Sequence, residues 1–182
     1  GGVTIVNPFG PTLEANSKRP PLTATGIRTL APLLEVHPRL TRLNLCGNNI
    51  QDEGLKHLCR GIQALPSLLR IELSTNSITH KGAKHLADAI CTQASTLEVL
   101  LLSDNELGDK GIAELSLSLS HCHALQQLDL ASNSITEEGG KHLADHLAPL
   151  TSLQHLNVSN NPQLGAAGAL TVAGGTSRLA GL

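Results

Sequence analysis

Leucine and other aliphatic residues recur along this chain in a fixed pattern with a period of 28 or 29 residues. Each copy reads Leu-x-x-Leu-x-Leu-x-x-Asn-x-Ile/Leu, and the regular copies begin at Leu40, Leu68, Leu97 and Leu125. A looser fifth copy begins at Leu153 and contains one extra residue around Pro162. Such a period indicates a solenoid, in which no unit can bury its own apolar face and successive units must stack.

Each copy divides into a strand-like half and a helix-like half. In the first copy, Leu43 and Leu45 share one side of an alternating pattern, which predicts a short strand. Residues 50–62 then carry apolar side chains at helical spacing. Strands one repeat apart can pair in parallel, and a parallel pair needs a crossover that is usually helical. The pattern therefore predicts an α/β solenoid with one parallel sheet and one helix in each repeat.

An asparagine follows every strand-like half at the same position of the repeat. Where the chain turns inward after a strand, backbone groups lose their sheet partners, and an amide can satisfy both donors and acceptors. We therefore expect a structural ladder inside the stack, formed by Asn48, Asn76, Asn105, Asn133 and Asn161.

The repeats also predict the domain organisation. A chain of 182 residues is expected to form one domain. We expect the repeat domain to cover residues 22–182 and to open with a half-repeat at 22–39. Residues 1–21 are rich in proline and predict an irregular lead-in or N-terminal cap, with a degenerate strand around Leu13–Ser17. The last helical segment contains two consecutive glycines, so we expect a truncated array with an uncapped or frayed end.

Composition restricts the function classes further. Phe9 is the one aromatic residue, so the core must be aliphatic. A formal net charge of −2 provides no basic field that would attract nucleic acid or an anionic membrane. No run of apolar residues approaches the length of a transmembrane helix, and no signal peptide is recognisable.

The copies resemble the ribonuclease-inhibitor-type leucine-rich repeat, the long intracellular class with a full α-helix in each unit. The resemblance covers residues 22–172 and rests on the five asparagine-centred copies. It implies a horseshoe or arc with the parallel sheet on the concave face and the helices on the convex face. Ribonuclease inhibitor, the Ran GTPase-activating protein, the sensing arms of NOD-like receptors and many scaffold proteins belong to this class, so it predicts the fold and leaves the function open.

This chain departs from two members of the class. Ribonuclease inhibitor is rich in cysteine and contains tryptophan, whereas this chain has four cysteines and no tryptophan. The Ran activator ends in a strongly acidic tail, which is missing here. The cysteines form no Cys-x-x-Cys pair and no terminal cluster, so free thiols and an intracellular, cytoplasmic location are expected; they are Cys46, Cys59, Cys91 and Cys122.

The concave face of such an arc carries the variable strand positions. One row across the repeats reads Arg42, Arg70, Val99, Gln127 and His155. The second row reads Asn44, Glu72, Leu101, Asp129 and Asn157. Val99 and Leu101 are apolar residues aimed at solvent among charged neighbours, a common arrangement of interface hot spots, although single exposed aliphatics are also ordinary. The candidate partner-binding residues are Arg42, Arg70, Glu72, Val99, Leu101, Asp104 and Asp129.

Metal binding and catalysis find little support. His142 and His146 are four residues apart on a predicted helix, a spacing that can hold a metal, but no third ligand is evident. Histidines on successive helices and around Cys122 are better explained as solvated polar residues; the helix column is His57, His85, Glu114 and His142. The chain has no phosphate-binding loop and no nucleophile elbow. We therefore expect no metal, no cofactor and no catalytic residue.

The sequence thus favours a non-enzymatic protein–protein interaction module or scaffold that binds a protein partner on its concave face. Rigid stacking organises such a face before the partner arrives, so little ordering entropy is lost on binding. Two alternatives are the sensing or autoinhibitory arm of a NOD-like receptor and a Ran-type GTPase-activating protein. We expect one or more protein partners, no nucleic acid, no membrane, and a monomer as a fragment.

Overall fold

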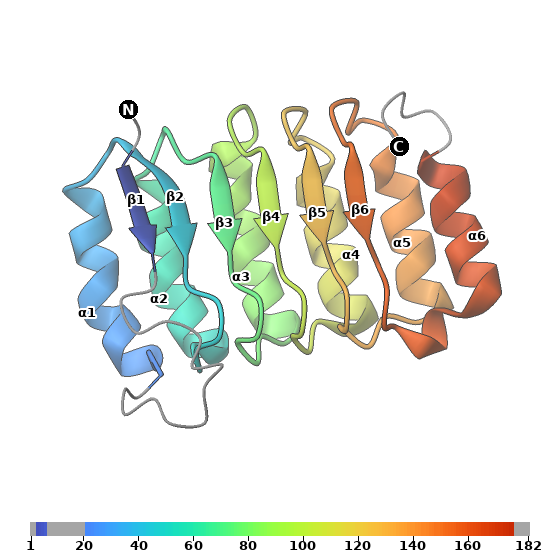
Figure 1. Cartoon of the computed structure of the whole chain (residues 1–182), viewed down its shortest axis with the longest axis horizontal. Helices are drawn as coiled ribbons and strands as arrows, with labels where there is room; N and C mark the ends of the chain where they lie inside the picture. Colours follow the sequence, from blue (N-terminus) through green and yellow to red (C-terminus); the bar gives the residue numbers. More distant parts are fainter. Residues whose placement is uncertain (1–2, 7–20, 177–182) are drawn as a thin grey trace.

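The computed structural model describes residues 3–6 and 21–176. Within these residues, strands and helices alternate, and the strands form one sheet in chain order (Figure 1). The strands are β1 (Val3–Val6), β2 (Leu40–Asn44), β3 (Arg70–Glu72), β4 (Val99–Leu101), β5 (Gln127–Asp129) and β6 (His155–Asn157). The helices are α1 (Ala24–Glu35), α2 (Gln51–Gln63), α3 (His80–Ile90), α4 (Gly108–Leu119), α5 (Glu137–Leu147) and α6 (Gly165–Thr176). Two short 3₁₀ helices, η1 (Cys91–Gln93) and η2 (Pro162–Leu164), complete the repeats.

All strand pairs of the described residues are parallel, and from β2 to β6 the same repeat position is paired in every strand. Leu43 pairs with Ile71, and Leu100 pairs with Leu128. All four side chains are fully buried. Because successive strand residues point to opposite faces, burying these positions leaves their neighbours on the other, open face of the sheet.

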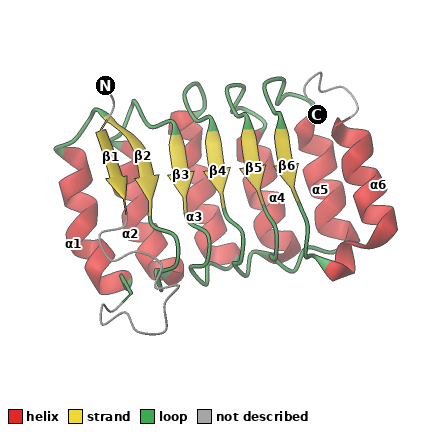
Figure 2. Cartoon of the chain, in the orientation of Figure 1, coloured by secondary structure: helices red, strands yellow, loops and turns green. Residues whose placement is uncertain are grey.

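The helices lie on one side of the sheet, behind the strands in Figure 2. Each helix buries an aliphatic stripe against the strands, as α2 does with Leu55, Leu58 and Ile62. Neighbouring helices approach closely at their first turns, where a Cβ on Gly54 would lie 3.0 Å from the Ala24 backbone. The predicted α/β leucine-rich-repeat solenoid is therefore confirmed. No helix among residues 21–176 combines the length and hydropathy needed to cross a membrane.

The ladder asparagines tie each repeat to the one before it. The Oδ1 atom of Asn105 accepts hydrogen bonds from the backbone N–H groups of Asn76 at 3.1 Å and Ile78 at 3.0 Å. Its Nδ2 atom donates to the carbonyl oxygens of Leu73 at 3.1 Å and Leu102 at 2.9 Å. The other four ladder asparagines are also buried and bond to backbone in the same manner. One amide therefore satisfies backbone groups of two repeats.

The turn after the ladder asparagine alternates between two geometries, a feature that the sequence pattern did not predict. In repeats beginning at residues 40 and 97, positive φ falls three residues after the asparagine, at Gln51 (57°) and Gly108 (58°). In the repeats beginning at residues 68 and 125, positive φ falls directly after the asparagine, at Ser77 (53°) and Ser134 (56°). The chain thus has a longer period of two repeats.

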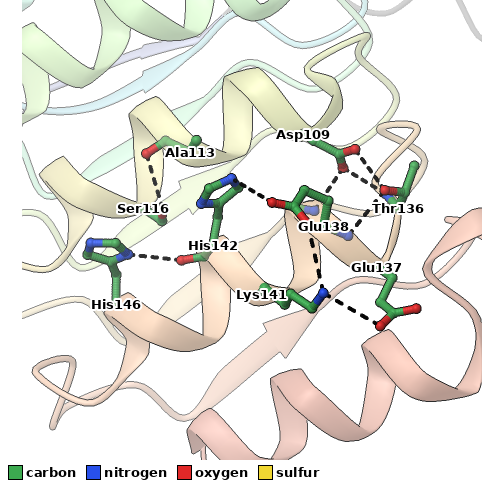
Figure 3. Close-up of polar contacts among 10 residues, drawn as sticks. Asp109, Ala113, Ser116, Thr136, Glu137, Glu138, Lys141, His142 and His146 are labelled. Atoms are coloured by element: carbon green, nitrogen blue, oxygen red, sulfur yellow. Dashed lines mark hydrogen bonds and ion pairs between the residues drawn. The ribbon is translucent and has the colours of Figure 1, made fainter.

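An aspartate strengthens every second junction between helices. Asp109 Oδ1 accepts from the backbone N–H groups of Thr136 at 2.8 Å and Gly139 at 3.0 Å, and Oδ2 accepts from Thr136 Oγ1 at 2.7 Å (Figure 3). Asp52 makes equivalent bonds to α3. A Cβ on Gly139 would collide with the Asp109 carboxylate. Each of these acids lies in the first turn of its own helix, where negative charge favours the dipole, and it also caps the helix of the next repeat.

The chain ends differ in part from expectation. Within residues 1–21, which the sequence predicts as an irregular lead-in or N-terminal cap, the structure contains strand β1, which pairs in parallel with β2 and has a register shift between Val3 and Thr4. The β-branched sequence Val-Thr-Ile-Val favours this extended conformation. The degenerate strand expected at Leu13–Ser17 lies outside the described residues. At the other end, α6 continues through its two glycines to Thr176.

Candidate functional site

The outward-facing strand residues form two rows across the open face of the sheet. Strand pairing aligns the first row, Arg42, Arg70, Val99, Gln127 and His155. It also aligns the second row, Asn44, Glu72, Leu101, Asp129 and Asn157. We refer to these ten residues as the open strand face. Six of the seven predicted partner-binding residues lie in it.

Glu72 organises the positive end of this face. Its Oε1 atom accepts from Arg42 Nε at 2.8 Å and from Arg70 Nε at 2.6 Å. A second nitrogen of Arg42 lies 2.7 Å from the same oxygen. Asn44 Nδ2 donates to the other oxygen, Oε2, at 3.0 Å. Hydrogen bonds between ionised groups are stronger than neutral ones, so this cluster fixes two long side chains across β2 and β3.

Glu72, which the sequence predicts as a partner contact, is buried within the chain. Only 6% of the residue is exposed, and both carboxylate oxygens are already bonded within the chain. Arg42 and Arg70 keep 44% and 30% of their side-chain surface exposed. Each guanidinium has five N–H donors, so both arginines retain donors for a partner. Two guanidinium groups and one carboxylate leave the cluster with one net positive charge.

Val99 and Leu101 form the apolar centre of the open strand face. Both are half-buried, which is less exposed than the sequence suggests. They flank the fully buried Leu100 on β4, between the charged cluster on β3 and the polar residues of β5. Removing the remaining apolar surface from water would favour association, because burial yields roughly 25 cal/mol for each Å².

Asp129 provides a carboxylate on the far side of this apolar pair. Its Oδ1 atom accepts from the backbone N–H of Ala131 at 3.0 Å. Asn44 and Asn157 make the same bond at equivalent positions, to Cys46 at 3.1 Å and to Ser159 at 3.0 Å. This local bond fixes the end of each strand. Asp129 Oδ2 has no bonding partner within the described residues, so the acid can still accept from a ligand.

Asp104 belongs to the loop that follows β4, not to either row. It is exposed, with a φ of 55°. Equivalent loop residues in the other repeats also have positive φ, including Gly47 (67°) and Thr75 (58°). The loop conformation is therefore set by the repeat and not by the residue at this position. Asp104 can contact only a partner that extends past the end of β4.

The two histidines of α5, His142 and His146, lie on the helical side and make local contacts. His142 Nε2 lies 3.7 Å from Glu138 Oε1, and Lys141 Nζ lies 3.9 Å from Glu138 Oε2 (Figure 3). His146 Nδ1 lies 2.9 Å from the carbonyl oxygen of His142, which binds one of its ring nitrogens to backbone. Among residues 3–6 and 21–176, no group of three or more potential ligands converges on a metal position.

None of the four cysteines forms a disulfide within the described residues. Burial raises the pKa of Cys59 to about 12 and that of Cys122 to about 11, with smaller raising contributions from Asp88 and Cys91 respectively. Cys91 is exposed, and Cys46 is partly exposed with a pKa raised mainly by burial. High pKa values keep the buried thiols protonated and poorly nucleophilic at neutral pH.

Comparison with known proteins agrees with this architecture. The profile of a family described as Leucine Rich repeat matches residues 37–59, 93–116, 121–144 and 150–173, more than half of the chain. No curated protein matches the chain.

Two solved structures show limited similarity to it. One is the LRR ectodomain of the plant membrane receptor kinase GASSHO1/SCHENGEN3 from Arabidopsis thaliana, in complex with CASPARIAN STRIP INTEGRITY FACTOR 2. It is 18% identical over 72% of this chain and 16% of that chain, with a TM-score of 0.44. The other is an internalin (inlF) from Listeria monocytogenes, 16% identical over 80% of this chain and 74% of that chain, with a TM-score of 0.21. The chain therefore spans only a small part of the plant ectodomain.

Proposed function

Because the chain belongs to the leucine-rich repeat family, we propose that it is a non-enzymatic protein-interaction module or scaffold whose partner docks on the open strand face. The observation that supports this most is the half-buried pair Val99 and Leu101 beside the charged cluster around Glu72. Interface hot spots commonly combine an apolar centre with arginine and a polar rim. In this proposal Arg42, Arg70 and Asp129 contact the partner, Glu72 positions the two arginines, and Asp104 contacts the partner at the rim.

The surface is also held rigidly before a partner binds. The ladder asparagines connect successive repeats, and Glu72 fixes Arg42 and Arg70. Binding therefore immobilises few additional side chains, and less free energy is lost to ordering.

Affinity capture with matched variants tests the proposal. The bait proteins are the wild type, Leu101→Arg on the open strand face, and Leu117→Arg on α4. Leu117 is 57% exposed and lies on the helical side, so its substitution adds the same charge away from the proposed site. We expect a protein retained by the wild type and Leu117→Arg to be lost from Leu101→Arg. Equal retention by all three baits would place the partner elsewhere.

We also propose that the chain belongs to the ribonuclease-inhibitor-type class of leucine-rich repeats. Full helices of 11 to 13 residues in every repeat support the ribonuclease-inhibitor-type class. An experimental structure with extended or 3₁₀ segments in place of these helices would contradict it. The NOD-like receptor and Ran-type activator alternatives receive no support from the comparisons.

We also propose an intracellular setting, which is supported by four cysteines that form no disulfide among the described residues. Thiol alkylation of the natural protein, followed by mass spectrometry, tests this. Four alkylated cysteines are expected after denaturation without reductant. A disulfide between any two of them would contradict a reducing compartment.

A further inference from the structure

Charged and apolar groups follow a fixed order across the open strand face. The cluster on β2 and β3, with Arg42, Arg70 and Glu72, carries one net positive charge. The apolar residues of β4 come next. Asp129 on β5 then provides a carboxylate with one unpaired oxygen. A ligand that crosses the strands therefore meets a cation, an apolar surface and an anion in that order.

We propose that this face binds an extended peptide segment with an acidic, an apolar and a basic residue at alternate positions, lying across the strands from β2 to β5. The proposal deepens the proposed function and rests on it. The acidic residue accepts hydrogen bonds from the free guanidinium donors of Arg42 and Arg70. The apolar residue covers Val99 and Leu101. The basic residue pairs with Asp129.

Strand spacing sets the spacing of the peptide residues. Neighbouring strands are about 4.8 Å apart, so the path from the midpoint of β2 and β3 to β5 is about 12 Å. An extended chain advances about 3.3 Å for each residue, so four residues cover about 13 Å. Residues i, i+2 and i+4 of an extended chain also share one face. The three recognised residues therefore occupy positions i, i+2 and i+4.

The charges around the two rows follow the same order. Arg39 is exposed directly before β2. Glu98 directly precedes β4, and Asp104 follows it. The positive potential is thus at the N-terminal end of the sheet, and the negative potential is toward β4 and β5. A partner segment with the opposite polarity is steered into one orientation, since complementary charges favour correct encounters.

NMR titration of the whole 182-residue chain tests the proposal at low salt, because it measures weak affinities and locates the contacts. The probe peptide has the central sequence Glu–Ser–Leu–Ser–Lys, flanked by glycine and serine. Three control peptides carry Glu–Ser–Leu–Ser–Glu, Lys–Ser–Leu–Ser–Lys or Glu–Ser–Ser–Ser–Lys. We expect the probe to bind about two- to fivefold more tightly than the two charge controls, since an exposed ion pair contributes up to about 1 kcal/mol. It should also bind more tightly than Glu–Ser–Ser–Ser–Lys, which buries less apolar surface. Amide shifts are expected on β2 to β5.

A charge exchange makes the test specific for Asp129. Asp129→Lys is expected to invert the preference, so that Glu–Ser–Leu–Ser–Glu binds more tightly than the probe. Gained affinity for that peptide cannot come from a misfolded variant. Asp129→Asn, which can keep the hydrogen bond to Ala131, is expected to abolish the preference without inverting it.

Two results would overturn this inference. One is the absence of shifts on β2 to β5 with every peptide. The other is an unchanged order of affinities in Asp129→Lys. The proposed function fails separately, when Leu101→Arg retains the captured protein. If Leu101→Arg loses the captured protein but the wild type does not bind the probe peptide, the open strand face recognises a folded surface of its partner. Only the peptide proposal is then wrong.

Discussion

Two positions four residues apart in each repeat differ in how strictly the fold fixes the residue type. The ladder position is always asparagine and is always buried. The second-row position holds Asn44, Glu72, Leu101, Asp129 and Asn157 in turn, and all but Glu72 are half-buried or exposed. The ladder side chains face the backbone of a neighbouring repeat, which has the same geometry every time, so one residue type serves throughout. The row faces solvent or a partner and can vary.

Glu72 is the exception within the row, since it is buried and fully bonded by its neighbours. It shows that an outward-facing position can still act through its neighbours. In this account Glu72 positions the two arginines, whereas the half-buried Leu101 one strand away is available to a partner.

Substitution at the ladder gives the largest expected loss of stability. Asn105→Leu removes the acceptor of the Asn76 and Ile78 N–H groups and the donor to the Leu73 and Leu102 carbonyls. Because a buried unpaired polar group costs about 1–3 kcal/mol, we expect the free energy of unfolding to fall by at least about 3 kcal/mol. Urea unfolding measures this change.

The adjacent loop residue is the matched control. Asp104→Asn removes the charge of an exposed side chain in the same turn and keeps a residue type that tolerates its φ of 55°, so we expect a change below about 0.5 kcal/mol. Equal losses in the two variants would contradict the separation of the ladder from the exposed surface.

The aspartate junction on the helical side gives a smaller loss. Asp109→Ala leaves the Thr136 and Gly139 N–H groups without their acceptor, and we expect about 2 kcal/mol of destabilisation in thermal or urea unfolding. Asp109→Asn keeps an acceptor and should lose less. Asp145→Ala, an exposed acid on α5, is the control and should be nearly neutral. A loss from Asp145→Ala as large as that from Asp109→Ala would point to net charge as the cause.

The buried thiol of Cys59 makes the stability of the protein depend on pH. The folded-state pKa of Cys59 is raised to about 12, so the unfolded state releases its proton first as pH rises above about 9. The stability contributed by the buried thiol is complete below pH 9 and decreases toward pH 12. At pH 10 we expect a loss of about 1 kcal/mol that is absent in Cys59→Ala. An identical alkaline loss in both proteins would assign it to other groups.

Substitution at a residue with positive φ gives the smallest expected change in the free energy of unfolding. Such a position is restricted by its backbone conformation even where its side chain is exposed. Gln51 is exposed but has a φ of 57°, where Gly108 occupies the equivalent turn. Glycine adopts this conformation without steric cost, so Gln51→Gly is expected to stabilise the protein by about 0.5 kcal/mol. Gln51→Val should destabilise it by more than that. A gain from Val would contradict the left-handed turn.

The sequence predicts features that depend on the repeat alone. The period places the ladder asparagines and both rows, because identical units stack in one register. Features that depend on particular cross-repeat contacts were not predicted. The burial of Glu72 needs Arg42 and Arg70 on two strands at once. The sequence does contain a pattern that marks the alternating turns. Asp52 precedes Thr79 by 27 residues, and Asp109 precedes Thr136 by the same interval.

The central claim is that the open strand face, and not the stability of the stack, determines binding. Paired measurements of melting temperature and partner dissociation constant for the wild type, Leu101→Arg and Leu117→Arg test it most directly. We predict that Leu101→Arg weakens binding at least about tenfold, or about 1.4 kcal/mol, with a melting temperature within about 2 °C of the wild type. Unchanged binding in Leu101→Arg, or equal weakening in Leu117→Arg, would contradict the claim.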